Sequence, residues 1–561
     1  MASEQRVSGL SIAMLVVGAV GIKALLGVGY KSTDFEVHRN WMAVTSSLPL
    51  GQWYTDTTSA STLDYPPLFA WFERILALGA AAIEPSMVRL QPDAYDSPAC
   101  TAFQRATVIA SDSVLVAGVL LYASTWAVPG TSTTNPSASG GRVLVALGLA
   151  LLNGGLLIVD SVHFQYNGML LGVLALTLAC WRAGWPVLGA VSLTCLVLLK
   201  HLFLVLGPLA LLLLLRAHVA GGPMRPAPFA ASQLVLAPAA TAPAPGVLAA
   251  ARRFAQLGAA VLAVLALVLG PFLATTGPAD GAKAYDGALP AARQIASRLF
   301  PVSRGLTHTF WAPNAWALYR AADCAGARTV LGERCVVATR GVLADGASSA
   351  MQLLPEVSAG AAAALTLAAM LPALLVVWRR PNARLGALAA AQCALSAFLF
   401  GWHVHEKAAL AALLPLGLAA AESPDAARAF IALAGPALSA LCPLLFGVED
   451  RLVGLALVAA FVLGACWALQ ALHGVDDVSL TWLGGAGFAA SCVWAAWPLI
   501  AAALGRGEAW MPFLPLMAVS CTCAVGVVWS WADLSFRVLP AAAAALAAPV
   551  EGGRAAKTKQ E

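Results

Sequence analysis

Long apolar runs recur along the whole chain of 561 residues and constrain its fold more than any other feature. Most of them approach the roughly 20 residues that an α-helix needs to cross the hydrocarbon core of a bilayer. The runs lie at 8–29, 104–128, 141–160, 164–181, 185–199, 201–216, 254–276, 357–378, 383–401, 408–421, 428–446, 452–472, 482–504 and 510–531. They predict an all-α polytopic membrane protein with roughly fourteen transmembrane helices.

The composition agrees with a chain whose main solvent is lipid. Charged residues make up 11% of the chain and hydrophobic residues 60%, whereas soluble domains carry about 25% charged residues. The net charge of +5 is spread out and forms no basic block, which argues against a nucleic-acid partner. The first run lacks a clear small-residue cleavage site and is long enough to span, so we expect a retained helix rather than a signal peptide.

The distribution of arginine predicts which loops face the cytosol. With a cytosolic N-terminus, the arginines next to the short loops fall on the cytosolic side, as the positive-inside rule requires. These are Arg182, Arg216, Arg252, Arg253, Arg379, Arg380 and Arg384. The long loops 30–103 and 277–356 then lie in the lumen, and the Ala- and Pro-rich linker 217–253 and the tail 551–561 are cytosolic. We expect one membrane domain over 1–561, in which Cys324 and Cys335 can pair if the lumen is oxidising.

Four polar motifs lie at the predicted luminal ends of the helices. They are STDFEVHRNW at 32–41 with LDYPP at 63–67, VDSVHFQYNG at 159–168, SRLFPVSRGL at 297–306 with FWAPNAWALY at 310–319, and FGWHVHEKA at 400–408. Ionisable side chains next to a membrane core are costly, so a cluster of them on one face indicates a functional site.

The residue types in these motifs fit the transfer of a sugar from a lipid phosphate. A carboxylate at the membrane surface can take the proton of an acceptor hydroxyl. Arginine, lysine and histidine can hold a leaving phosphate, and tyrosine and tryptophan can pack on a sugar ring. The motifs show no spacing typical of a metal site, and basic side chains can stabilise the phosphate instead. We therefore expect no metal, no cofactor and an activity that survives chelation.

Taken singly, each motif also has a structural interpretation. Asp34 and Arg39 can form an ion pair that holds a loop, and LDYPP can be a rigid turn. His403 and His405 can be interfacial histidines, and the aromatic residues can form an interfacial belt. A secondary transporter also has many spans and intramembrane charges, although it would place its substrate residues near mid-span in broken helices. Only the joint pattern favours an enzyme.

Together the motifs resemble the signature blocks of the dolichyl-phosphate-glucose-dependent alpha-1,3-glucosyltransferases of the endoplasmic reticulum, from about residue 32 to residue 410. The resemblance implies a GT-C fold and an inverting reaction, in which a beta-linked glucosyl phosphate gives an alpha-1,3 product. Within the family, the segments 311–314 and 403–405 look like those of the member that adds the second glucose, to the monoglucosylated nine-mannose dolichyl-diphosphate oligosaccharide. The sister enzyme that adds the first glucose stays an alternative. The linker 217–253 departs from the compact loop that the family leads us to expect.

The resemblance also implies roles for individual residues, with Asp34 as the general base. The donor phosphate is expected to meet His403, His405, Glu406, Lys407, Arg298 and Arg304. Acceptor or sugar contacts are expected from Glu36, Arg39, Trp41, Asp64, Tyr65, His163, Gln165, Tyr166, Asn167, Trp311 and Asn314. The implied partners are the donor dolichyl phosphate glucose, the dolichyl-diphosphate oligosaccharide acceptor and the lipid bilayer.

The family works in the endoplasmic-reticulum membrane, with its active site in the lumen, and the same address is expected here. The last residues are Lys557, Thr558, Lys559, Gln560 and Glu561, so that lysines occupy the third and fifth positions from the end. This is a dilysine pattern of the kind that retrieval machinery reads in the cytosol. An even number of spans from a cytosolic N-terminus would place the tail there.

Overall fold

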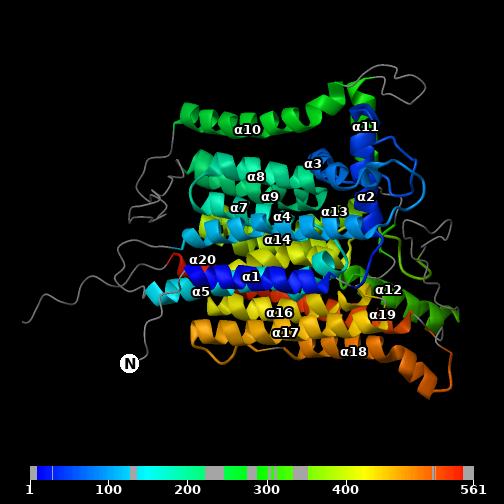
Figure 1. Cartoon of the computed structure of the whole chain (residues 1–561). Helices are drawn as coiled ribbons and strands as arrows, with labels where there is room; N and C mark the ends of the chain where they lie inside the picture. Colours follow the sequence, from blue (N-terminus) through cyan, green and yellow to red (C-terminus); the bar gives the residue numbers. More distant parts are fainter. Residues whose placement is uncertain are drawn as a thin grey trace, which may run out of the picture.

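The computed structural model describes residues 9–27, 29–126, 136–221, 246–274, 287–300, 305–308, 312–332, 351–445, 447–479, 481–507, 511 and 513–547. They form a bundle of helices (Figure 1). The α-helices are α1 (Gly9–Leu26), α2 (Asp34–Ser47), α3 (Pro67–Ile83), α4 (Pro98–Ser124), α5 (Pro136–Leu151), α6 (Gly154–Leu156), α7 (Asn167–Arg182), α8 (Pro186–Leu199), α9 (Gly207–Leu214), α10 (Val247–Ala274), α11 (Ala288–Leu299), α12 (Ala315–Gly326), α13 (Ala359–Arg379), α14 (Gly386–Phe400), α15 (Leu410–Ala420), α16 (Pro424–Ser439), α17 (Val448–His473), α18 (Trp482–Ala503), α19 (Leu514–Asp533) and α20 (Leu539–Ala545). The described ranges contain no strand.

The prediction of an all-helical polytopic chain is confirmed. Eleven helical segments in the described ranges are long and apolar enough to cross a membrane. Helices α7 and α8 are apolar but shorter, and α15 has 11 residues. Each apolar run of the sequence therefore corresponds to a helix. The adjoining runs 185–199 and 201–216 are distinct, because a 3-10 turn at His201–Leu206 separates α8 from α9.

Helices α14 and α16 fill the centre of the bundle, and α1 and α10 lie on its outside. Nearly all residues of α14 and α16 are buried, and α14 is rich in alanine, which lets neighbouring helices approach closely. The outer helices expose large apolar side chains such as Leu25 and Leu267. Exposed leucine is stable against lipid tails, which are equally apolar, so this pattern fits a bundle embedded in a bilayer.

Two glycines allow α4 and α7 to pack backbone against backbone. A Cβ atom on Gly118 would lie 2.4 Å from the carbonyl oxygen of Gly172, and one on Gly172 would lie 2.5 Å from the amide nitrogen of Leu115. Such distances are far inside van der Waals contact, so only glycine fits at both positions. The contact fixes the height of α7 relative to α4, and hence the place of Asn167 at the first turn of α7.

The elements next to the polar motifs lie at one end of the bundle. In Figure 1 helices α2, α3, α11 and α12 lie at the right-hand end, whereas α20 and the start of α1 lie at the left. Helix α7 runs between the two ends. It begins with Asn167 and finishes with Arg182, whose guanidinium donates to both carboxylate oxygens of Glu422 at 2.8 and 2.6 Å. Tyr122 donates to the same carboxylate at 3.1 Å, which completes a partly buried network at the end of α7.

Candidate active site

Asp34 is the first residue of α2, directly after the loop that follows α1. A carboxylate is stabilised there because the first turn of a helix presents amide N–H groups and the positive end of the helix dipole. Ser32 fixes the entry to the helix, since its hydroxyl accepts from the Asp34 amide at 3.2 Å and donates to the carbonyl of His163. The first motif is thereby joined to the second.

The Asp34 carboxylate is the point at which the first, second and fourth motifs converge. Its Oδ2 atom accepts from Gln165 Nε2 at 2.7 Å, and it lies 3.3 Å from His163 Nε2 and 3.5 Å from Lys407 Nζ. The side chain of Asp34 keeps 22% of its surface exposed, so a substrate hydroxyl can reach it. Burial alone would raise the pKa of Asp34, but the nearby Lys407 ammonium and the His163 hydrogen bond hold that pKa well below its usual range. The carboxylate is therefore ionised at neutral pH.

A chain of amides connects Asp34 to a second cation, Lys200. The Gln165 carbonyl oxygen accepts from Asn167 Nδ2 at 2.9 Å, and the Asn167 carbonyl oxygen accepts from Lys200 Nζ at 3.2 Å. The Lys200 ammonium also lies 5.2 Å from the centre of the Tyr65 ring. Lys200 was not among the predicted site residues. Its signal in the sequence is a charge placed directly at the end of the apolar run 185–199. A charge is energetically costly at such a position, so a residue of this kind indicates a functional site.

The fourth motif follows α14 and is held by the loop before α12. The His403 amide donates to the Leu306 carbonyl at 3.0 Å, and Thr307 forms an isolated parallel bridge with Val404. His403 has a φ of +52°, a left-handed conformation that is uncommon for a residue other than glycine. The fixed loop brings His308 beside the fourth motif, so that the His308 and His405 ring centres lie 3.9 Å apart. Sequence reasoning missed His308, which no motif contains.

Glu406 and His405 directly precede Lys407 in the fourth motif, and no hydrogen bond or ion pair with Asp34 is recorded for them among the described residues. Glu406 is buried at the start of a 3-10 turn, and burial raises the pKa of its carboxyl. Burial and then the neighbouring His308 imidazole lower the pKa of His405 well below its usual range, with Lys407 adding to the effect. His405 is therefore neutral at pH 7.

Glu36 and Arg39 support α2. The alternative of an ion pair between Asp34 and Arg39 is wrong, because Arg39 pairs with Glu36, one helical turn away, and donates to the Arg89 carbonyl at 2.9 Å. Arg39 is fully buried, and Glu36 also accepts from the Tyr95 amide at 3.0 Å. Both side chains thus hold the helix that carries Asp34.

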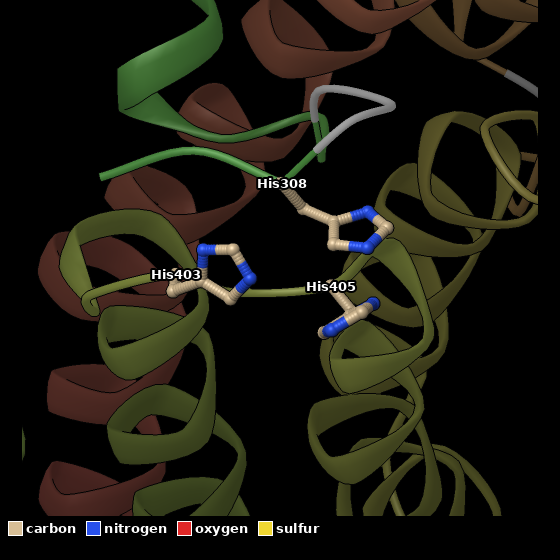
Figure 2. A group of neighbouring side chains, drawn as sticks. All are labelled: His308, His403 and His405. Atoms are coloured by element: carbon tan, nitrogen blue, oxygen red, sulfur yellow. The ribbon is translucent and has the colours of Figure 1, made fainter. Parts of the chain in front are cut away.

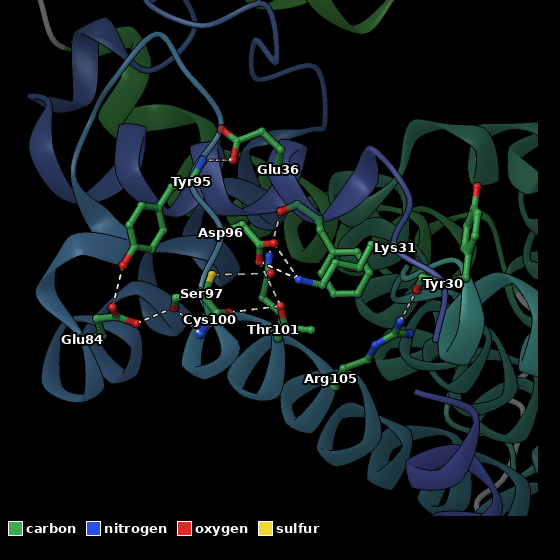
Figure 3. A network of polar contacts seen from close by, with 12 residues as sticks. Tyr30, Lys31, Glu36, Glu84, Tyr95, Asp96, Ser97, Cys100, Thr101 and Arg105 are labelled. Carbon is green, nitrogen blue, oxygen red and sulfur yellow. Dashed lines mark hydrogen bonds and ion pairs between the residues drawn. The ribbon is translucent and has the colours of Figure 1, made fainter. Parts of the chain in front are cut away.

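The segment from Glu84 to Arg105 ties α2 and the loop before it to α4 (Figure 3). Glu84 accepts from the Tyr95 hydroxyl at 2.5 Å and from the Ser97 hydroxyl at 2.6 Å. Further along, Lys31 donates to Asp96 at 2.7 Å, and Arg105 donates to the Tyr30 carbonyl at 2.7 Å. These contacts fix both sides of Asp34 to one rigid platform.

The predicted aromatic contacts divide into buried and accessible ones. Trp41 and Tyr166 are buried, with Trp41 Nε1 donating to the Thr62 carbonyl at 3.1 Å and the Tyr166 hydroxyl 2.8 Å from that of Thr107. They form part of the packing behind the site. Tyr65 is only partly buried, and its ring lies beside Trp41, with 4.9 Å between ring centres.

The described site residues of the third motif, Arg298 and Asn314, have their recorded contacts away from Asp34. Arg298, on α11, donates to the carbonyls of Tyr54 at 3.1 Å and Asp56 at 3.3 Å. Asn314 is buried and caps the N-terminus of α12, accepting from the Trp316 amide at 3.1 Å. Each thus has a structural partner in the described part of the chain. Arg304 and Trp311 lie outside the described residues, as do most of the linker 217–253 and the whole tail 551–561.

Two further features bear on the predicted luminal side. Cys324 on α12 is disulfide-bonded, as expected in an oxidising compartment, while Cys335 lies outside the described residues. An apolar cleft of about 260 Å³ opens beside the LDYPP segment, between α8, α10 and α11. Its lining includes Pro66, Leu198, Leu273 and Ile295.

Comparison with known proteins agrees with the motifs. The model of the ALG6, ALG8 glycosyltransferase family matches residues 19–534. A mouse protein named dolichyl pyrophosphate Glc1Man9GlcNAc2 alpha-1,3-glucosyltransferase is 36% identical over 540 residues, which cover 94% of this chain and 95% of the mouse protein. A protein of the same name from Arabidopsis thaliana is 34% identical over 532 residues. A Drosophila melanogaster protein, whose name adds the word probable, is 35% identical over 554 residues. They cover 91% and 96% of this chain, and 95% and 98% of their own lengths. These matches confirm the resemblance, and the chain belongs to the ALG6, ALG8 glycosyltransferase family.

Proposed function

We propose that this enzyme transfers glucose from dolichyl phosphate glucose to the monoglucosylated nine-mannose dolichyl-diphosphate oligosaccharide, forming an alpha-1,3 linkage. The relatives carry the name of an enzyme that acts on an acceptor with one glucose. The observation that carries the mechanism is the meeting of Lys407 and His163 at one carboxylate oxygen of the partly exposed Asp34. That arrangement puts a base and a phosphate-binding cation within one site.

In the proposed reaction Asp34 takes the proton of the acceptor 3-hydroxyl as its oxygen attacks the anomeric carbon of glucose. The bond from that carbon to the phosphate oxygen breaks, and dolichyl phosphate leaves with the electron pair. Attack from the face opposite the leaving phosphate inverts a beta-linked donor to an alpha product. Lys407 and Lys200 stabilise the charge on the departing phosphate, which is typical electrostatic catalysis.

Lys407 links the two halves of this mechanism. Its ammonium lies 3.5 Å from the Asp34 carboxylate, where it lowers the pKa of the proposed base. A donor phosphate would compete for the same ammonium, since charge-assisted hydrogen bonds to phosphate are strong. Donor binding would then raise the pKa of Asp34 toward its ordinary value and make the carboxylate a better base. The Asp34 carboxylate would thus become a stronger base only when a donor is bound.

We propose that the apolar cleft beside Pro66 receives part of the isoprenoid chain of a lipid substrate. Its walls are almost purely apolar, as an isoprenoid requires. Pro66 lines the cleft, and the preceding Tyr65 contacts Lys200 through its ring. The LDYPP segment would thus join the lipid-binding surface to the chemical site. Asp64, Tyr65 and His163 are the proposed sugar contacts.

We further propose that the protein lies in the endoplasmic-reticulum membrane with Asp34 and His405 in the lumen and both ends of the chain in the cytosol. The start of α1 and α20 lie at the same end of the bundle, opposite α2 (Figure 1). The arginines that the positive-inside rule assigns to the cytosol include Arg182, which lies at the end of α7 remote from Asn167. A cysteine introduced by Asp56→Cys, within the loop before α3, tests the placement in sealed microsomes with a thiol reagent that does not cross membranes. Labelling before permeabilisation would contradict it.

Transfer to three acceptors tests the proposed function. The purified chain would receive dolichyl phosphate glucose and nine-mannose acceptors bearing no, one or two glucoses. Transfer to the monoglucosylated acceptor alone supports the proposal. Preference for the acceptor without glucose would identify the sister activity instead, and solute flux in proteoliposomes without any transfer would identify a transporter.

A further inference from the structure

Three histidines from two distant parts of the sequence converge beside the fourth motif. His308 comes from the loop before α12, and His403 and His405 follow α14. One nitrogen of each imidazole lies within 4.8 Å of one nitrogen of each of the others. Figure 2 shows the three rings around a common space, with His308 on one segment and the other two on its neighbour.

The backbone holds this histidine cluster in place before any ligand binds. The bridge joins Thr307, the neighbour of His308, to Val404, which lies between His403 and His405, and the His403 amide donates to the Leu306 carbonyl at 3.0 Å. His403 has a left-handed φ, which is a strained backbone conformation for a residue other than glycine. Residues with such strain cluster at functional sites. These contacts keep the segment of His308 beside the segment of His403 and His405.

The hydrogen bond of His403 leaves its other ring nitrogen suited to bind a metal. Its Nδ1 donates to the Gly305 carbonyl at 3.1 Å, so the proton is on Nδ1 and Nε2 carries the lone pair. Metal-binding histidines commonly fix their tautomer through such a hydrogen bond to a backbone carbonyl. Neutral imidazoles so close together present lone pairs to a common point, whereas three protonated rings in this space would repel one another.

We propose that His308, His403 and His405 bind one transition-metal ion, best fitted by Zn²⁺, with a fourth coordination position open. Three imidazoles are a ligand set that zinc uses with water or substrate in the fourth position. In a tetrahedral site the nitrogens lie about 3.3 Å apart, so small ring rotations would close the observed spacing. All three side chains are partly exposed, which leaves an entry path for the ion.

The ion would add a positive charge near Lys407, because its ligand His405 is two positions before Lys407 in the sequence. This departs from the expectation of a site without metal, which rested on spacings within single motifs. The fourth coordination position of the ion would accept an oxygen ligand, and a phosphate oxygen is one such ligand. The binding site stands on the geometry of the histidines alone and does not depend on the proposed glucosyl transfer.

Metal uptake by the full chain tests the proposal. The protein would be purified in detergent without a polyhistidine tag, loaded with zinc, desalted and measured by elemental analysis. We expect about one zinc per chain. His308→Ala, His403→Ala and His405→Ala should each weaken binding at least about tenfold, because even loss of an outer partner of a metal ligand costs that much. His473→Ala is the matched control, since His473 lies at the end of α17 and contacts the Ala420 carbonyl; it should bind zinc normally.

Cobalt loading of the unaltered chain gives a measurement that does not depend on folding of the variants. A tetrahedral Co²⁺ spectrum that zinc displaces supports the site. Failure of the unaltered chain to bind zinc, an octahedral cobalt spectrum, or unchanged zinc binding in all three folded variants would overturn the proposal. None of these readouts uses a sugar donor, so the outcome is separate from that of the transfer assay.

Discussion

Replacing Asp34 by asparagine tests the general base with little change in shape. The new side chain keeps an oxygen that can accept the Gln165 hydrogen bond, now 2.7 Å long, and loses only the charge and the ability to take a proton. The position is partly exposed and opens no core cavity. The Asp34→Asn protein should therefore fold and insert normally, which gel filtration and thermal unfolding in detergent would show.

The size of the effect follows from the chemistry that the carboxylate supplies. Loss of a general base lowers kcat by about 10²–10⁴-fold, which corresponds to about 3 to 5 kcal/mol of transition-state stabilisation. The KM for dolichyl phosphate glucose should change much less, because the donor phosphate is proposed to meet Lys407 and Lys200. Asparagine also removes the competitor for Lys407, so donor binding should be at least as tight as in the unaltered enzyme.

A transfer assay with labelled dolichyl phosphate glucose and the monoglucosylated acceptor gives both constants. Asp477→Asn is the matched control, because Asp477 pairs with Arg428 away from the site, with 62% of its side chain accessible. Exposed pairs of this kind contribute little, so the control should retain near-normal turnover. A folded Asp34→Asn enzyme with kcat within threefold of normal would refute the assignment of the base.

The remaining predictions concern Lys407, the amide chain from Asp34 to Lys200, the ion pair of Arg182 with Glu422, and the contact between α4 and α7. Lys407→Gln should raise the KM for the donor more than that for the acceptor; because the ammonium lowers the pKa of Asp34, its loss raises that pKa, and the acid-side fall of kcat/KM should begin at a higher pH. Gln165→Leu should lower kcat about tenfold or more through loss of a hydrogen bond to a charged group, with Gln165→Asn as the polar comparison. Glu422→Ala should lower thermal stability by about 3–5 kcal/mol, the usual cost of leaving a buried charge unpaired, with normal specific activity in the surviving folded fraction. Gly172→Ala should lower the yield of folded protein and displace Asn167, and normal Tm and kcat together would contradict the role of the α4–α7 contact.

The helices could be predicted from the sequence because their signals are local and strong, and the common side of Asp34 and Lys407 followed from them. An apolar run predicts a helix wherever the chain must satisfy its backbone in lipid, and all fourteen runs were found as helices. The sided arrangement of the loops placed Asp34 and Lys407 on one face, although 373 residues separate them. The sequence assigned His163 and Gln165 to sugar or acceptor contacts, and only the structure shows that both lie against the Asp34 carboxylate.

The partners within the site could not be predicted, because several interactions compete for each side chain. Arg39 was assigned to Asp34 or to the acceptor, yet it pairs with Glu36; the three-residue spacing on a helix was a signal for that pair. Trp41 was assigned to a sugar, but burial of its ring governs its position. His308 became part of a cluster only through a bridge to a segment almost a hundred residues away, which no local pattern reveals.

The distance along the chain between Asp34 and Lys407 has a consequence for biosynthesis. At the roughly 5–20 residues per second of protein synthesis, the 373 residues between them take roughly 20 to 75 s to emerge. During that interval the carboxylate has been made but its ammonium partner has not. The growing chain must therefore keep an isolated charge hydrated at the membrane surface, and the site can close only when α14 and α15 have inserted. A ribosome that stalls before α14 would release a chain with most of its helices and no working centre.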